Sequence, residues 1–426
     1  MIYPGPLTKQ QRQKTQNNYC TFVFLNGVSY MCLGETIILL FAVKLNAPNY
    51  MGAALSAVIY FAYFMLPLGK FVAARVGAAR SQAVFWTLRN ITALGVAASA
   101  VTAYCGYPTL ALIQIFIGAC LFYGLRAAGI VMSQPLLGNM AINDERPHLI
   151  ARSNALFYCG CTGTLLILWN VLRINDSVWL ITGIIAVGAC VGVTSTRYIR
   201  RMDESQELIA AARRPLMPEV RQAWRLPIMR KLVLAMFVST LAIIMIGSTS
   251  VLGVKRGCGI SDTSALYFSL IQFIASTGVS FFSGRIIRRF GSRSSLWCGL
   301  VMMFMTATLW LLAPTEVNYP YLTILFVLIG GANVLCSNGL QNYFLRVTPL
   351  PLHVAASMMT QVATSVGAGL SGMLISGSIF KLLSVYCAGL EPLSSFKIYF
   401  CSAFLLIALL SVFIWKLPPE NTVECK

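Results

Sequence analysis

The stretch RYIRRMDESQELIAAARRPLMPEVRQAWRLPIMRK, residues 197 to 231, divides the chain into two apolar halves. It contains nine basic and four acidic residues; 196 residues precede it and 195 follow it. This pattern predicts domains at 1–196 and 232–426 that are joined by a basic linker. Residues 203–212 favour a helix. In this helix, Leu208 and Ile209 are expected either on the inner membrane surface or on a solvated linker helix. The basic residues of the linker are expected near anionic lipid.

The composition indicates a membrane protein. Hydrophobic residues make up 57% of the 426 and charged residues 11%, whereas soluble domains are about half apolar and a quarter charged. The net charge of +19 therefore indicates topology rather than a nucleic-acid partner, since Lys and Arg accumulate on cytoplasmic loops. The thirteen cysteines form no CxxC pair, so no disulfide framework, metal site or cofactor is expected. The polar start of the chain predicts no removable signal peptide.

Twelve apolar runs are long enough to cross a bilayer, which takes about 20 residues per helix. They must be helices, because backbone groups in lipid need internal hydrogen-bond partners. The runs are 19–43, 50–68, 81–104, 107–131, 151–172, 178–196, 232–253, 263–284, 295–313, 320–342, 353–380 and 397–416. The predicted fold class is an all-α polytopic membrane protein with two six-helix bundles.

The distribution of basic residues predicts the orientation of these spans. With the N-terminus in the cytoplasm, 24 of the 32 Lys and Arg residues lie on the cytoplasmic side and six on the other. The positive-inside rule then places both termini in the cytoplasm. We expect a monomer, multi-pass in the cell (inner) membrane.

The two halves share a short basic turn around a glycine. The loop after the second span reads KFVAARVGAAR (70–80) around Gly77, and the loop after the eighth reads GRIIRRFGSR (284–293) around Gly291. Internal repeats of this kind are typical of secondary transporters. The two turns are predicted gating loops, with Arg75 and Gly77 in the first and Gly291 and Arg293 in the second.

Twelve spans, a long central loop and these two turns together resemble the major facilitator superfamily over essentially the whole chain. The family motif has an acid where this chain has Ala74 and Arg288, and its leading glycine is replaced by Lys70 in the first copy. In the family that acid helps latch the closed cytoplasmic side, so the resemblance implies a latch that is weakened or built differently. Arg126-Ala-Ala-Gly129 is similar to the family's arginine motif in the fourth span.

The resemblance implies two helical bundles that rock about a central site, and transport of a small solute without covalent chemistry. No catalytic residue is expected.

Only three charged residues lie well inside predicted spans: Glu35, Arg89 and Arg126. A charge in hydrocarbon costs at least about 2.5–3.5 kcal/mol, so such residues usually face a cavity or a partner. The alternative is a structural polar contact or snorkelling. At 1.5 Å per residue, Arg89 and Arg126 lie roughly 12 and 10 Å deep and Glu35 roughly 25 Å up.

These depths suggest two hypotheses for the charged residues. The arginines could bind an anionic solute, with Glu35 as the proton-coupling group, because burial would raise the pKa of Glu35. A direct Glu35–Arg126 bridge would need a tilt or kink. Asn26 and Tyr30 share a face of the first helix, and Glu35 lies about 180° from Asn26. The three can line one cavity only if this helix is interrupted, which Gly27 and Gly34 permit.

Uncharged polar residues recur at helical spacing in the C-terminal half. The eighth span carries a stripe of serines together with Gln272. For the serines, helix–helix packing is the favoured interpretation. Cavity lining remains open for the amide residues. The predicted substrate-binding set is Arg126, Arg89, Gln272, Asn333, Asn338, Gln361 and Tyr30.

We therefore predict a secondary transporter of a small amphipathic or anionic solute. Under the hypothesis that Glu35 is the coupling group, transport is driven by protons. The alternative is a non-transporting membrane protein of the same fold, such as a receptor-like or assembly factor. A dry interior without polar groups would favour that alternative. A membrane enzyme is opposed by the lack of paired carboxylates, His clusters and nucleophile motifs.

Overall fold

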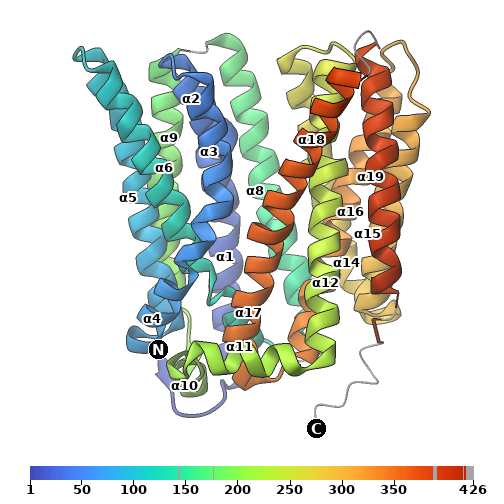
Figure 1. Ribbon diagram of the computed structural model, residues 1–426. Coiled ribbons are helices and arrows are strands. Elements are labelled where there is room, and N and C mark those ends of the chain that lie inside the picture. The colour runs from blue at the N-terminus through green and yellow to red at the C-terminus, as the bar shows by residue number, and fades with distance from the viewer. Residues whose placement is uncertain (143, 176, 387–390, 416, 419–426) are drawn as a thin grey trace. The chain divides into compact units, whose positions relative to one another are not determined.

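The computed structural model describes residues 1–142, 144–175, 177–386, 391–415 and 417–418. The side chains of residues 35, 49, 50, 53, 56 and 262–264 lie outside the described set. Within these limits the chain is almost wholly helical, and twelve helical segments are long and apolar enough to cross a membrane. This confirms the predicted all-α polytopic fold (Figure 1). The orientation of the termini remains a prediction.

The chain divides into two compact units that do not follow chain order alone. The first contains Met1–Arg146, Leu156–Glu219 and Leu350–Met358. The second contains Pro147–Ala155, Val220–Pro349 and the described residues from Met359 onward. Two short segments thus belong to the unit formed mainly by the other half of the chain. The predicted domains, 1–196 and 232–426, assign each of these segments to its own half of the chain. These boundaries remain a prediction.

The first unit contains the helices of the N-terminal spans. Helices α1 and α5 pack on α9, and α5 also packs on α6, which Figure 1 shows as a group of long helices. The elements are β1 (Ile2–Tyr3), α1 (Lys9–Leu33), α2 (Glu35–Lys44), α3 (Asn49–Phe61), η1 (Ala62–Met65), α4 (Leu66–Val76), α5 (Ala78–Tyr104), α6 (Pro108–Ile130), α7 (Ser133–Met140), most of α8 (Arg146–Ile174), α9 (Val178–Arg200), β2 (Glu204–Ser205), α10 (Gln206–Arg213), the start of α11 (Leu216–Arg225), η4 (Leu350–Leu352) and the first residues of α17 (His353–Gln361).

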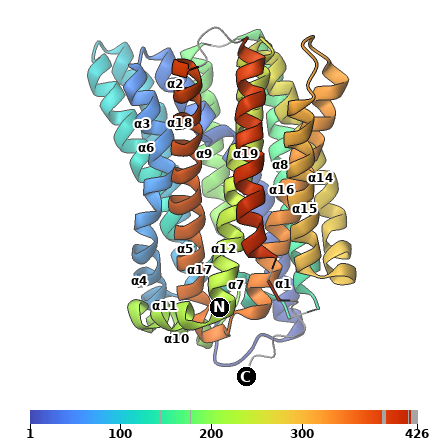
Figure 2. The ribbon, with the colours of Figure 1, turned by 45° about the vertical axis from the view of Figure 1, so that its right-hand side comes forward.

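The second unit is built around α16, which packs against α14 and α15, while α15 also packs against α19. Figure 2 shows α15, α16 and α19 running beside one another. Its remaining elements include three π-helical segments in the seventh and eleventh spans. The elements are α12 (Pro227–Ala242), η2 (Ile243–Ser248), α13 (Thr249–Leu252), η3 (Gly253–Gly257), α14 (Asp262–Phe290), α15 (Ser292–Leu311), α16 (Tyr319–Val347), η5 (Val362–Leu370), α18 (Ser371–Tyr386) and α19 (Pro392–Ile414).

Local sequence explains where several helices begin and end. A capping box starts α1, because the Thr8 side chain accepts from the backbone N–H of Gln11 and the Gln11 side chain accepts from Thr8. Gly77 and Gly291 separate consecutive helices with φ of 97° and 84°, values that favour glycine. The two predicted basic turns are therefore tight helix–helix corners.

The first span is interrupted, which its two glycines permit. Helix α1 ends at Leu33, Gly34 takes extended backbone angles (φ −64°, ψ 165°), and α2 begins at Glu35. Gly27 stays inside α1 and lies against the Phe157 carbonyl of α8, where a Cβ would collide. Of the two glycines that could interrupt the helix, Gly34 does so.

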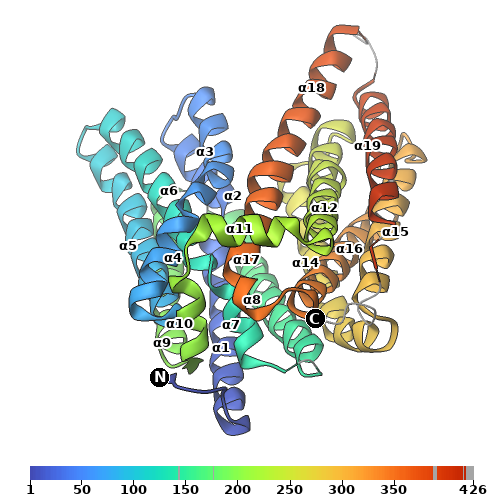
Figure 3. The same cartoon turned by 60° about the horizontal axis from the view of Figure 1, so that its bottom comes forward.

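The linker is more ordered than the sequence predicts. Residues Glu204–Ser205 pair in parallel with Ile2–Tyr3 as a two-stranded sheet, and α10 packs on α4 (Figure 3). Leu208 and Ile209 are buried there. Both expectations for these two residues, membrane surface and solvated helix, are therefore wrong, because α10 uses its apolar face to pack on the first unit.

Candidate functional site

A small cavity of the first unit contains both buried arginines of the predicted site. Arg89 comes from α5 and Arg126 from α6, two helices that pack along each other. The cavity has a volume of about 40 Å³. Its lining residues are Tyr30, Leu33, Gly34, Ile59, Arg89, Phe122, Tyr123 and Arg126. The structure thus brings three predicted site residues together, Arg89, Arg126 and Tyr30, and adds the break at Gly34.

Aromatic faces and amide oxygens hold the guanidinium of Arg89, which is 2% exposed. Its carbon lies 4.8 Å from the ring centroid of Trp86 and 5.1 Å from that of Phe122. Its Nη2 donates weakly, over 3.5 Å to Asn26 Oδ1 and over 3.4 Å to Asn90 Oδ1. Its Nε is buried without a hydrogen-bond partner. Cation–π contact lowers the cost of a buried charge but does not neutralise it.

Arg126 sits over the ring of Tyr30, with 5.3 Å between the guanidinium carbon and the ring centroid. None of the ion pairs among the described side chains includes Arg126 or Arg89. The described lining of the cavity therefore combines two guanidinium groups with aromatic and aliphatic side chains. Such a site suits an anion, since guanidinium groups present fixed donors to carboxylate or phosphate oxygens.

Glu35, the predicted proton-coupling residue, is the first residue of α2 and follows Gly34 directly. Gly34 lines the cavity, so the backbone at Glu35 begins next to it. The side chain of Glu35 lies outside the described side chains, and its role remains a prediction.

The sequence places Asn26 on the face of Tyr30 but does not predict that Asn26 and Asn90 contact Arg89. Asn26 accepts a 3.1 Å hydrogen bond from Trp86 Nε1 as well as the contact from Arg89. Asn90 donates to the Trp86 carbonyl over 2.7 Å. Asn26 lies four residues before Tyr30 on α1, so the two share a helix face as predicted.

The predicted site residues of the C-terminal half lie on α14, α16 and α17. Asn338 is fully buried; it donates to Ser283 Oγ over 2.7 Å and accepts from Asn154. These bonds join α16 to α14 and to the start of α8, and Ser276 donates to the Gly330 carbonyl across the α14–α16 contact. The role of Asn338 in substrate binding remains a prediction. Gln272 and Asn333 are half-buried. Gln361 is half-buried and is the last residue of α17, directly before the π-helical segment η5.

The first predicted gating loop is occupied by an acid from the linker. Glu204 lies over Gly77, where a Cβ would collide with its carboxylate, and it accepts from the backbone N–H groups of Ala78 and Ala79 at 2.7 and 3.3 Å. Arg75 stacks on Phe71, with 4.2 Å from its guanidinium carbon to the ring centroid. Thus a carboxylate does reach the loop that carries Ala74 in the acid position, but it comes from the linker.

Further contacts tie the linker to this loop. Lys70 Nζ donates to the Arg214 carbonyl over 2.6 Å and lies 3.5 Å from Glu219 Oε2. Arg213 Nε donates to the Ala74 carbonyl over 3.0 Å. Lys70, which stands in place of the motif's leading glycine, is therefore used to hold the linker.

In the second gating loop, Gly291 makes the corner between α14 and α15. Arg293 Nη2 donates to the Trp415 carbonyl over 3.0 Å. Gly284 lies against Ala151 and the Pro147 carbonyl of the same unit. Both predicted gating glycines therefore mark corners between consecutive helices.

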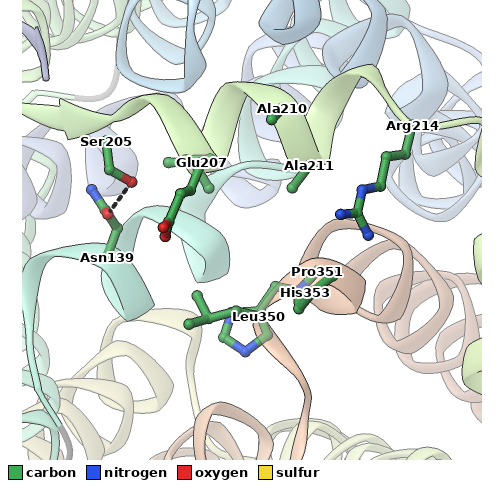
Figure 4. Close-up of a pocket in the computed structure, with 10 residues that line it drawn as sticks. Asn139, Ser205, Glu207, Ala210, Ala211, Arg214, Leu350, Pro351 and His353 are labelled. Carbon is green, nitrogen blue, oxygen red and sulfur yellow. Dashed lines mark hydrogen bonds between the residues drawn. The ribbon is translucent and has the colours of Figure 1, made fainter. Parts of the chain in front are cut away.

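A second, larger cavity of the first unit lies beside the linker (Figure 4). It has a volume of about 340 Å³. Ser205 donates to Asn139 Oδ1 over 2.8 Å at one end, and Glu207 and Arg214 point into it in Figure 4. It is formed by α7, the linker, η4 and α17, so it is separate from the cavity of Arg89 and Arg126.

In the described part of the chain, twelve helices are long and apolar enough to cross a membrane, and two buried arginines line one cavity of the first unit. The family profile of the major facilitator superfamily matches residues 19–372, and the chain belongs to this family. Its class is therefore that of a membrane transporter. Among the described side chains, no three His, Cys, Asp or Glu groups lie close enough to hold a metal ion together.

Solved structures with the same fold cover nearly the whole chain. The proton:xylose symporter XylE matches with a TM-score of 0.72 at 15% identity, over 97% of each chain. The fucose:proton symporter FucP of E. coli matches with a TM-score of 0.68 at 14% identity, over 94% of this chain and 98% of its own. The human organic anion transporter MFSD10 matches with a TM-score of 0.65 at 14% identity, over 94% and 99%. No curated protein sequence matches this chain. At these identities the likeness shows the fold alone.

Proposed function

We propose that this secondary transporter moves a small anionic solute, or an amphipathic one with an anionic group, by alternating access. The observation that carries the proposal is that Arg89 and Arg126 line one cavity whose described lining contains no carboxylate. Two like charges in one low-dielectric site repel each other. A bound anion would balance this positive charge and accept from the guanidinium N–H groups.

The size of the cavity supports a site that opens and closes. Its volume of about 40 Å³ is little more than the roughly 30 Å³ that one water takes in the liquid. An organic anion cannot enter without enlarging it. Binding therefore requires α1, α5 and α6 to separate locally, which is the behaviour expected of an occluded transport site.

We further propose proton coupling through Glu35. The same fold serves proton symport in XylE and FucP, by their descriptions. Glu35 starts α2 directly after a cavity-lining residue, so its protonation state would act on the bound solute. In liposomes, Glu35→Gln is expected to abolish uptake driven by a pH gradient while solute binding is retained. Uptake that still responds to the gradient in this variant would contradict the coupling role.

The solute class is tested by thermal stabilisation of the purified protein. A panel of small organic anions, each paired with a neutral analogue of the same shape, is added to wild-type protein and to Arg126→Ala. Anions are expected to raise the melting temperature of wild type and not of the variant. Arg256→Ala is the control, because Arg256 is an exposed arginine of the second unit. Equal stabilisation by neutral analogues, or an unchanged response in Arg126→Ala, would exclude the anion site.

A second candidate is a non-transporting protein that keeps the fold, as a monomer in the cell (inner) membrane. It is favoured by the absence of the motif acid at both Ala74 and Arg288. The two candidates separate in reconstituted liposomes: a stabilising anion that is bound but never carried across the bilayer would favour the second.

A further inference from the structure

We propose that a groove between α15 and α19 of the second unit binds a membrane glycerophospholipid with an anionic headgroup. The two helices pack along each other and lie side by side in Figures 1 and 2. The groove has a volume of about 410 Å³. It is lined by Trp297, Phe304, Ala408, Ser411, Val412 and Trp415.

One part of the groove suits an acyl chain. Phe304 packs edge-on to Phe404, with 5.2 Å between ring centroids, and Ala408 leaves space beside it. Val412 is 66% exposed. On a span of this membrane protein, an open apolar groove faces hydrocarbon, and a lipid tail is the apolar partner present there.

Two polar groups in the groove lack a partner and need one. Ser411 is 5% exposed, and its hydroxyl makes no hydrogen bond. The indole Nε1 of Trp297 is buried and also unpaired. A buried donor without a partner costs about 1–3 kcal/mol. The ester carbonyls of a glycerolipid are acceptors at the depth where Trp side chains usually lie.

A cation stands at one end of the groove. Arg293 donates one N–H to the Trp415 carbonyl over 3.0 Å, which fixes the guanidinium beside the Trp297–Trp415 pair, whose ring centroids are 5.2 Å apart. A guanidinium has five N–H donors, so others are left for a phosphate.

These three kinds of group follow one another along one helix face. On α15, Arg293, Trp297 and Phe304 are spaced by four and seven residues, which places them on one face. At 1.5 Å per residue, Trp297 lies about 6 Å beyond Arg293 and Phe304 about 10 Å further. The order of cation, hydrogen-bond donor and apolar surface matches phosphate, ester and acyl chain. This match identifies the occupant as a phospholipid rather than a fatty acid or a second helix.

The proposal is tested with delipidated protein in detergent, titrated with phosphatidylglycerol or with phosphatidylcholine of the same acyl chains. Bound lipid is counted by native mass spectrometry. Wild type is expected to prefer phosphatidylglycerol. Arg293→Gln should lower the affinity for phosphatidylglycerol about five-fold and remove the preference. The double variant Trp297→Phe with Ser411→Ala should weaken both lipids about five-fold.

Matched controls are available in the same elements. Arg289→Gln removes a charge of the same turn that stacks on Phe290, and Ser402→Ala removes an exposed hydroxyl of α19 that bonds its own helix. Both should bind lipid nearly as wild type does. Tryptophan fluorescence gives a second readout: lipid brominated in the acyl chain should quench wild type more than Trp297→Phe. Equal lipid binding by wild type and the double variant would overturn the proposal. So would a groove that is filled by a second copy of the chain, seen as a dimer that the double variant disrupts.

Discussion

The carboxylate of Glu204 accepts a hydrogen bond of 2.7 Å from the backbone N–H of Ala78. This places an acid of the linker at the first turn of α5, where the first N–H groups have no partner within the helix. The side chain is 2% exposed. The contact makes the linker part of the first unit rather than a free tether, and the following three predictions test it.

Removing the Glu204 side chain should destabilise the protein. Glu204→Ala takes the acceptor away from Ala78 and Ala79 and leaves a buried space, so the free energy of unfolding should fall by about 1–2 kcal/mol. Denaturant titration or thermal melting in detergent measures the change. Glu207→Ala is the control, because Glu207 is an exposed acid of the same segment; an equal loss in that variant would show that Glu204 has no special role.

The same residue predicts a pH dependence. Burial raises the pKa of Glu204, while the N–H groups of Ala78 and Ala79 and the charge of Arg80 act in the opposite direction. A carboxyl whose pKa is higher in the folded state stabilises the fold below its unfolded value of about 4.3, and this contribution is lost as pH rises through the raised pKa. Glu204→Gln, which stays neutral and keeps an acceptor oxygen, should melt like wild type at acidic pH.

At neutral pH, Glu204→Gln should therefore melt at a higher temperature than wild type. The measurement is a series of melting temperatures of the two proteins from acidic to neutral pH. A constant difference between the two curves would show that Glu204 does not titrate in this range.

Gly77 and Glu204 should be energetically coupled. Gly77→Ala forces a Cβ into a position with φ of 97° and into the Glu204 carboxylate; backbone strain alone costs about 1 kcal/mol or more. In the Glu204→Ala background the collision is gone and only strain remains. A double-mutant cycle should therefore give a coupling energy of at least about 0.5 kcal/mol. Strict additivity of the two substitutions would contradict the contact.

In the second unit, Tyr399 satisfies a backbone carbonyl released by a π-helical segment. Its hydroxyl donates to the Met245 carbonyl of η2 over 2.9 Å and lies 2.7 Å from Ser376 Oγ and 3.2 Å from Thr249 Oγ1. Tyr399→Phe should lower the free energy of unfolding by about 1–3 kcal/mol, since buried polar groups lose their partner. Tyr386→Phe, at an exposed tyrosine of α18, should leave the melting temperature unchanged; a similar shift in both would refute the role of the buried hydroxyl.

The sequence predicts the elements of this fold well because hydropathy and helix length are local properties. All twelve spans, the corners at Gly77 and Gly291 and the possibility of a break at Gly34 follow from runs and spacings. The joint position of Arg89 and Arg126 also follows from counting residues along two neighbouring spans. Membrane insertion restricts charged residues so strongly that these two stand out.

What the sequence does not predict depends on contacts between distant segments. Glu204 and Ala78 are 126 residues apart, and no local pattern of the linker indicates that it would cap α5. From the sequence, Leu208 and Ile209 of α10 could lie on the membrane surface or on a solvated helix. Only the packing of α10 on α4 shows that they are buried. The local sequence around Asn338 does not indicate its partners. Its hydrogen bonds with Ser283 and Asn154 depend on how α14, α16 and the start of α8 pack.

Because of the break at Gly34, the cavity of Arg89 and Arg126 has a further partial positive charge that comes from the backbone. No side-chain substitution can remove it. The aligned peptide dipoles of a helix place about half a positive charge at its N-terminus, and α2 begins next to the cavity that Gly34 lines. A variant lacking both Arg89 and Arg126 should therefore retain a weak preference for anions over their neutral analogues. The backbone would then contribute part of the selectivity for anions, and the arginine side chains would contribute most of the affinity.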